Sequence, residues 1–210
     1  MMLDSTRIEA ISLVELLSPA RVGLAAMEAR LREVVQDQHE MLTAATDHLL
    51  DSGGKRIRPA VALLSSQMFN GDFKCAVALA AAVEMLHTAT LVHDDLIDGS
   101  LLRRGIPTLN ANWSPDSTVL TGDYLFARAA SFAAQTQSVG VMNLFAETLM
   151  VIVNGEIKQK FSTRDRLSHD DYYGRIRAKT ASMFALAAEA GAVLGQASEV
   201  ETQAMRQFGL

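Results

Sequence analysis

The sequence has few of the residues that cross-link or stiffen a chain. Among its 210 residues there are one cysteine, Cys75, and four prolines. A single cysteine excludes an internal disulfide and fits a reducing, cytoplasmic environment. Few prolines together with 49% hydrophobic residues exclude a disordered or repeat protein, so we expect one globular domain spanning residues 1–210.

Positive charge is also scarce over the chain as a whole. The formal net charge is −5 and the basic residues cluster locally, which argues against general nucleic-acid binding. Asp4, Arg7 and Glu9 interrupt the start of the chain, so we expect no signal peptide. Glu84 and His87 interrupt one of the longest apolar stretches, so none reaches the roughly 18 residues of a membrane span. We expect a soluble protein without stable membrane insertion.

The chain contains no alternating apolar and polar run that predicts a strand. Helical spacing of apolar residues, such as Leu24, Met27 and Leu31, predicts an all-α fold instead. The expected helices cover about residues 20–50, 60–70, 74–98, 118–135, 138–161 and 169–195. We expect loops at 105–117, around Trp113, and at 163–167.

An acidic cluster ends the helix expected at 74–98. Asp94 and Asp98 are four residues apart and share a helix face, whereas Asp95 points elsewhere. Two adjacent carboxylates repel by roughly 4 kcal/mol at an effective dielectric near 20, which favours a bound cation. Magnesium prefers such oxygen ligands and completes its shell with water and phosphate oxygens. The alternative is a solvated acidic helix end.

His87 lies seven residues before Asp94 and returns to nearly the same helix face. A lone histidine on an apolar helix is usually a core residue. Its alignment with Asp94 and Asp98 favours a polar cavity lined by this face. Val83 and Thr90 share the stripe, which also fits the wall of an apolar tunnel.

A second basic cluster follows two glycines, in the sequence Gly53–Pro59. The glycines predict the end of a helix at about Asp51, and Pro59 fits the first turn of the next helix. Lys55 and Arg58 would then flank a helix N-terminus, where free N–H groups favour an anion. The Walker-type phosphate loop is absent. The alternative is an ordinary solvated turn.

Together these segments resemble the trans-polyprenyl diphosphate synthases. The matching segments are Gly53–Pro59, His87 with Asp94–Asp98, Arg103–Gly105, Gly122–Phe126, Gly155–Gln159 and Lys179–Thr180, in the family's order. The resemblance implies an isoprenoid-synthase helical bundle with a central diphosphate-binding cavity. It also implies magnesium-dependent, head-to-tail condensation of isopentenyl diphosphate with an allylic diphosphate, giving a trans-polyprenyl diphosphate.

The resemblance assigns expected roles to individual residues. The expected metal ligands are Asp94, Asp95 and Asp98, and the catalytic residues are Asp94, Asp98 and Lys179. The allylic diphosphate would contact Arg103, Lys179 and Thr180. Isopentenyl diphosphate would contact Lys55, Arg58, His87 and Arg104.

The same resemblance suggests the length of the product. In the family, residues four and five positions before the first aspartate form the floor of the tail cavity, and here they are the small Thr90 and Ala89. An open floor predicts a medium or long product. The alternative is that a deeper residue, Met85, Met142 or Phe145, closes the tunnel.

The family's second aspartate-rich motif is not present in the sequence. Asp170-Asp171 has no third acid and instead fits a helix N-terminus after Ser168. Without the motif, ionisation of the allylic diphosphate should be impaired. We expect a truncated form or a sequence lacking its tail, rather than a short paralogue, because residues 51–180 keep the substrate-binding positions.

Two other functions are open at this stage. A class I terpene cyclase uses the same acidic helix, but it has one substrate and would not need Lys55, Arg58 and His87. A non-catalytic or regulatory subunit of a heteromeric prenyl synthase fits the missing second motif. The resemblance also implies a homodimer, with the regions around Met142 and Met150 as candidate contacts beside ordinary core packing.

Overall fold

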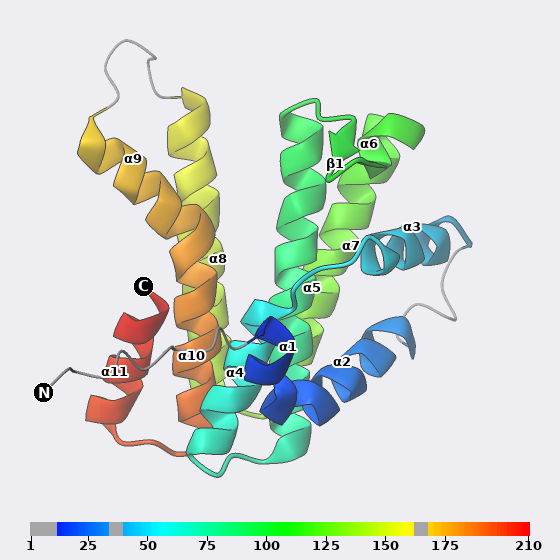
Figure 1. Cartoon of the computed structure of the whole chain (residues 1–210). Helices are drawn as coiled ribbons and strands as arrows, with labels where there is room; N and C mark the ends of the chain where they lie inside the picture. The colour runs from blue at the N-terminus through cyan, green and yellow to red at the C-terminus, as the bar shows by residue number, and fades with distance from the viewer. Residues whose placement is uncertain (1–11, 34–39, 162–167) are drawn as a thin grey trace, which may run out of the picture.

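The computed structural model describes residues 12–33, 40–161 and 168–210, and it confirms the all-α fold (Figure 1). Its helices are α1 (Leu13–Leu16), α2 (Arg21–Glu33), α3 (Glu40–Asp51), α4 (Ile57–Met68), α5 (Phe73–Ile97), α6 (Leu109–Asn112), α7 (Pro115–Ala134), α8 (Val139–Phe161), α9 (His169–Ile176), α10 (Ser182–Leu194) and α11 (Glu199–Gly209). A short 3-10 helix, η1 (Ser18–Ala20), precedes α2, and a π-helical segment, η2 (Arg177–Ala181), joins α9 to α10. Strands β1 (Leu102–Arg103) and β2 (Ile106–Pro107) form an antiparallel hairpin.

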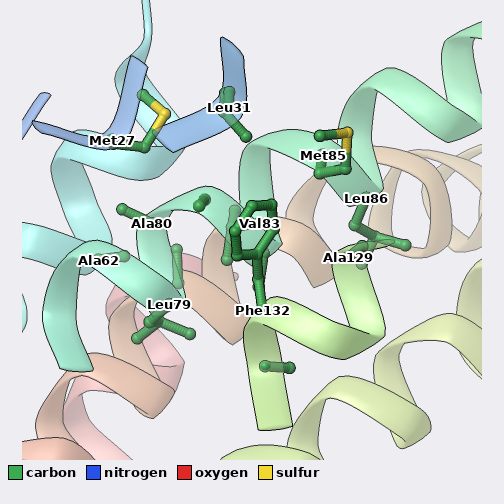
Figure 2. Close-up of a cluster of buried hydrophobic side chains, with 14 of the residues drawn as sticks. Met27, Leu31, Ala62, Leu79, Ala80, Val83, Met85, Leu86, Ala129 and Phe132 are labelled. Carbon is green, nitrogen blue, oxygen red and sulfur yellow. The ribbon is translucent and has the colours of Figure 1, made fainter. Parts of the chain in front are cut away.

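Helix α5 is the centre of the fold and packs against α2, α4, α7 and α10. It begins after Asp72, whose carboxylate accepts a hydrogen bond from the backbone N–H of Cys75 at 2.9 Å. Every residue of α5 from Ala76 to Leu86 is buried, as expected of a helix that is apolar on all sides. Figure 2 shows side chains of α2, α4 and α7, including Phe132, gathered around this stretch. The acidic cluster therefore lies at the C-terminal end of a helix that is buried over much of its length.

Most predicted helix spans are confirmed within a few residues. Residues 60–70, 74–98, 118–135 and 138–161 correspond to α4, α5, α7 and α8, and residues 169–195 to the run α9–η2–α10. The predicted helix end at Asp51 is confirmed. Ser168 begins α9 as predicted, with its hydroxyl accepting the backbone N–H of Asp171.

Two predictions about local structure are wrong. In place of one helix over residues 20–50, the structure has α2 and α3, which run in different directions (Figure 1). In place of a loop over 105–117, it has β2, α6 and the start of α7. The hairpin is closed by local bonds, from Thr108 N–H to the Leu101 carbonyl and from the Thr108 hydroxyl to the Ser100 carbonyl, which no periodic pattern signals. The loop predicted at 163–167 and the start of the chain with Asp4 lie outside the described residues.

Among the described residues, two helices are long and apolar enough to cross a membrane by length and composition alone. Helix α5 is 72% buried inside the protein over the relevant window, so its apolar character serves the core. The corresponding window of α8 is only 22% buried.

Candidate active site

A cavity of about 580 Å³, named the larger cavity below, lies where the start of α4, the middle of α5 and the β1–β2 hairpin meet. Its lining includes five cationic side chains, Lys55, Arg56, Arg58, Arg103 and Arg104, and two histidines, His48 and His87. Only two acidic side chains, Glu84 and Asp95, line it. A cavity with this excess of positive charge is suited to a polyanion such as a diphosphate.

The segment between α3 and α4 places its basic side chains through two left-handed residues. Gly53 has φ +74° and Arg56 has φ +49°, so the chain turns sharply before α4. Pro59 lies in the first turn of α4, as predicted. Lys55 is exposed and Arg58 is half-buried, and they flank the helix N-terminus. The free N–H groups and the helix dipole add to the positive charge of this end of the cavity.

Arg58 and His87 meet inside this cavity. The Nη1 of Arg58 lies 3.3 Å from Nε2 of His87, and its guanidinium stacks 4.7 Å from the ring centre of Phe184 on α10. Burial, and then the charges of Arg58 and the other arginines, lower the pKa of His87 to about 3. A neutral His87 can therefore accept a hydrogen bond from Arg58. The buried Nε of Arg58 has no hydrogen-bond partner among the described residues, so a donor is left for an anion.

The hairpin contributes the two arginines on the other side of the cavity. Arg103 donates to both oxygens of Asp95, with Nε–Oδ2 at 2.9 Å and Nη2–Oδ1 at 2.7 Å, and these hydrogen bonds raise its pKa. Arg104 is left-handed at φ +53°, and its Nη1 lies 3.5 Å from the carbonyl oxygen of Gly53. His48 of α3 contacts the hairpin through Nε2, 2.8 Å from a β2 carbonyl oxygen. The hairpin is thus tied to both α5 and α3.

The smaller cavity, about 350 Å³, lies on another side of α5, between this helix and α8. Asp94 of α5 and Asp98, directly after the end of α5, line it together with Glu156 of α8. Lys179 of η2 contacts two of these acids, with Nζ 2.9 Å from Oδ2 of Asp94 and 3.0 Å from Oε1 of Glu156. Burial raises the pKa of Asp94, with help from the charges of Glu156 and Asp98, although Lys179 opposes the shift. Lys160 also lines this cavity, so three carboxylates face two lysines and the formal charge of the group is negative.

Gly155 explains why η2 comes so close to α8. A Cβ atom built on Gly155 would lie 2.7 Å from the Cβ of Ala178, so any larger residue would push the π-helical segment away. Glycine at this position lets Lys179 reach Glu156, the next residue on α8. Single π-helical turns are frequent at functional sites, because they offset side chains relative to a regular helix.

Four predicted ligands of isopentenyl diphosphate are brought together. Lys55, Arg58, His87 and Arg104 all line the larger cavity. The three predicted ligands of the allylic diphosphate are divided: Arg103 lines the larger cavity, Lys179 contacts the acids of the smaller one, and Thr180 is exposed on η2.

The prediction that His87, Asp94 and Asp98 line one cavity is wrong. His87 lines the larger cavity, where Arg58 contacts it, while Asp94 and Asp98 line the smaller one, where Lys179 holds Asp94. The side chains turn toward partners on different elements, which helix periodicity alone does not reveal. The carboxylate of Asp95 accepts hydrogen bonds from Arg103 in the larger cavity, and its predicted metal role stays a prediction.

The two residues predicted to set product length differ in position. Thr90 lines the smaller cavity, whereas Ala89 is fully buried in the core.

Three residues that the sequence reasoning gave no role also belong to the site: Glu156, Arg56 and Phe184. Glu156 and Arg56 stand inside motifs that were recognised, but nothing in their spacing shows which side chain each one contacts.

The acids of the smaller cavity fit magnesium only with help from a substrate. Among the described residues, no group of three or more histidine, cysteine, aspartate or glutamate side chains is arranged to hold a metal ion. Magnesium is commonly held by one or two carboxylates, with water and substrate phosphates as the other ligands. The uncompensated negative charge around Asp94 fits such a shared site.

Comparisons with known proteins agree with this fold. The family model described as polyprenyl synthetase matches residues 39–210. Heptaprenyl diphosphate synthase component 2 of Geobacillus stearothermophilus is 39% identical over 190 residues, covering 89% of this chain and 58% of the relative. All-trans-nonaprenyl-diphosphate synthase (geranyl-diphosphate specific) of Rhodobacter capsulatus is 36% identical, covering 92% and 60%.

Solved structures show the same likeness. A decaprenyl diphosphate synthase from Rhodobacter capsulatus superimposes with a TM-score of 0.89 at 39% identity, covering 94% of this chain and 62% of the other. A polyprenyl synthase from Caulobacter crescentus, solved with calcium and isoprenyl diphosphate, gives a TM-score of 0.91 at 37% identity, covering 96% and 62%. The chain thus spans about three fifths of the length of these proteins. Because the family model covers most of the chain, this protein belongs to the polyprenyl synthetase family.

Proposed function

We propose that this protein is a prenyltransferase that condenses isopentenyl diphosphate with an allylic diphosphate to make a trans-polyprenyl diphosphate. The observation that carries this proposal is the pair of cavities flanking α5, one basic and one acidic with a lysine. A condensing enzyme needs two diphosphate sites. A terpene cyclase needs one, so the basic cavity argues against that alternative.

In this proposal the basic cavity binds isopentenyl diphosphate. Lys55, Arg58 and Arg104 supply positive charge, and the buried Nε of Arg58 supplies a donor without a partner of its own. Neutral His87 supplies a hydrogen bond without adding charge. Asp95 holds Arg103 at the same cavity, so we propose that Asp95 positions this arginine while Asp94 and Asp98 hold magnesium.

The smaller cavity would bind the allylic diphosphate, with Lys179, Thr180 and Arg103 as ligands, although Arg103 lines the larger cavity. When bound, magnesium supplies positive charge that stabilises the departing diphosphate. Lys179 carries a pre-placed ammonium for the same purpose, and its pKa is raised because the hydrogen bonds of Asp94 and Glu156 outweigh its burial. It therefore stays charged throughout the neutral range.

The proposed reaction has three steps: ionisation, carbon–carbon bond formation and loss of a proton. The allylic carbon–oxygen bond breaks, and its electron pair leaves with the diphosphate. The double bond of isopentenyl diphosphate supplies the pair for the new carbon–carbon bond. Loss of a proton restores a double bond, and the product is an allylic diphosphate longer by one five-carbon unit. Each cavity would bind the diphosphate end of one reactant, while the two carbon atoms that form the new bond must come within about 3–3.5 Å of each other.

We propose a medium or long product. Thr90 is small and lines the smaller cavity. Phe126 and Ile152 line the same cavity. The relatives have products of different lengths in their names, from geranylgeranyl to nonaprenyl diphosphate, so the family alone does not select one.

A second candidate function is that of one subunit of a two-component prenyl synthase. Two relatives, at 39% and 35% identity, are named heptaprenyl diphosphate synthase component 2. The two candidates differ in whether the chain makes product alone or only after a second protein is added.

The test is a condensation assay with the purified chain, magnesium, farnesyl diphosphate and radiolabelled isopentenyl diphosphate, with products resolved by length. Label in products longer than fifteen carbons, lost in Asp94→Ala, is the expected result. Product formed only after adding a partner protein would favour the second candidate. Activity unchanged in Asp94→Ala would refute the metal assignment.

A further inference from the structure

Arg56 is the one side chain of the Gly53–Arg58 segment whose three guanidinium nitrogens all donate to protein acceptors. Nε lies 3.1 Å from Oε1 of Glu28 on α2, Nη1 contacts Oε1 of Glu84 on α5 at 2.5 Å, and Nη2 lies 3.2 Å from the Leu50 carbonyl oxygen on α3. The Arg56 side chain is only 14% exposed. One side chain therefore ties this segment to three different helices.

Glu84 is the buried half of this contact. Its side chain is 7% exposed and lies in the stretch of α5 that is buried on all sides. A carboxylate in such a place is stable only if it is paired, and Arg56 is its ion-pair partner. Glu84 stands three residues before His87, so the pair fixes the segment against α5 one turn away from the imidazole.

The backbone of Arg56 needs such support. A φ of +49° is uncommon for a residue with a side chain, and it persists when surrounding contacts hold it. Lys55 lies directly before Arg56, and Arg58 lies two residues after it. The directions in which these two basic side chains leave the backbone depend on the conformation of Arg56.

We propose that Arg56 and Glu84 are positioning residues for the diphosphate of isopentenyl diphosphate. They hold Lys55 and Arg58 at the basic cavity and do not themselves touch the substrate. This inference rests on the proposed function of that cavity. It adds two residues whose effect should be confined to one of the two substrates, because neither Arg56 nor Glu84 lines the smaller cavity.

The competing explanation is that Arg56 itself binds the diphosphate, since it borders the cavity. The two explanations predict opposite effects of Glu84→Gln. If Arg56 bound the substrate, neutralising Glu84 would release the guanidinium and strengthen binding. If Arg56 is a positioning residue, the weakened pair would loosen the segment and weaken binding several-fold.

The experiment is calorimetric titration of isopentenyl diphosphate into the wild type, Glu84→Gln, Arg56→Lys and the double variant Arg56→Met/Glu84→Leu. The double variant removes both charges together, so no buried charge is left unpaired and the fold should survive. We expect its Kd for isopentenyl diphosphate to rise about tenfold or more. Arg56→Lys keeps the charge but not the three-way contact, so its Kd should lie between those of the wild type and the double variant.

Two controls separate positioning from general damage. The Kd for farnesyl diphosphate with magnesium should stay within about twofold of the wild type in every variant. The matched pair Arg206 and Glu189, 3.8 Å apart on α11 and α10, lies away from both cavities, and Arg206→Met/Glu189→Leu should leave the Kd for isopentenyl diphosphate unchanged.

Three results would overturn the positioning role of Arg56 and Glu84. They are stronger binding of isopentenyl diphosphate in Glu84→Gln, an unchanged Kd for it in the double variant, and an equal loss of affinity for both substrates. If the double variant fails to fold by its thermal transition, Glu84→Gln and Arg56→Lys decide by the same criteria. If the wild type itself binds no isopentenyl diphosphate, the proposed function fails, and the positioning role fails with it.

Discussion

At the scale of single residues, His87 is held neutral inside a cluster of arginines. Its pKa is lowered to about 3 by burial and by the neighbouring positive charges. In the unfolded chain its pKa would be near 6.5. As the pH falls through this value, the unfolded state takes up a proton that the folded state cannot, so the contribution of His87 to stability is lost as the pH drops.

This difference gives a prediction for His87→Gln. Between pH 7.5 and 5.5 the wild type should lose about 1.4 kcal/mol of unfolding free energy relative to the variant, measured by urea unfolding at each pH. Comparing the two proteins cancels the titration of every other group. The same pH dependence in both proteins would show that His87 titrates normally in the folded state.

Thr90 and Ala89 are neighbours in the sequence, but they should respond differently to enlargement. Thr90 lines the smaller cavity, so Thr90→Phe should fill it and shorten the product while the protein stays folded. Ala89 is fully buried, so Ala89→Phe should overpack the core and cost about 1–3 kcal/mol of stability or more. Product lengths from the condensation assay and thermal unfolding of both variants check this. Unaltered product length in Thr90→Phe would place the tail elsewhere.

At the scale of helices, the contact between α4 and α10 depends on glycine. A Cβ atom on Gly191 would lie 2.8 Å from the carbonyl oxygen of Ala62 and 2.7 Å from the Cβ of Ser65. Helix α4 carries Arg58 and α10 carries Phe184, so the packing of these two helices also brings the Arg58 guanidinium to the Phe184 ring. Backbone atoms on α4 cannot move aside cheaply, so the glycine is needed for packing.

Gly191→Ala should therefore lower the unfolding free energy by about 1–3 kcal/mol. Gly174 in α9 is a matched control, since nothing lies within 4 Å of its built Cβ. Gly174→Ala should raise stability by about 0.5–1 kcal/mol, because alanine is the better helix former. Thermal or urea unfolding of both variants is the measurement. Equal effects would mean that the α4–α10 contact can open without cost.

Helix positions were predictable because long apolar patterns mark them, and α5, α7 and α8 fall close to their expected bounds. The short hairpin was not predictable, because two-residue strands leave no periodic pattern in the sequence. At the site, the cluster of Lys55, Arg58, His87 and Arg104 was predicted from family resemblance and lies in one cavity. The pairings of Asp95 with Arg103 and Glu156 with Lys179 were not, because such contacts depend on how separate elements pack.

At the scale of the whole molecule, the chain contains the basic cavity and the first acidic cluster on one scaffold around α5. The resemblance to polyprenyl synthases also predicts a homodimer. Sedimentation equilibrium should then give twice the chain mass of 22.7 kDa at micromolar concentration. A mass that stays at one chain over the same range would contradict this expectation.

We propose that α5 separates two diphosphate sites, and Arg103 is the only proposed ligand that lines the cavity of the other site. The most direct test is the number of diphosphates bound per chain, measured in separate samples titrated with isopentenyl diphosphate alone or with farnesyl diphosphate and magnesium. We expect one of each per chain, with Arg58→Gln losing only isopentenyl diphosphate and Asp94→Ala losing only farnesyl diphosphate. A single shared site, or the loss of both ligands in either variant, would contradict it.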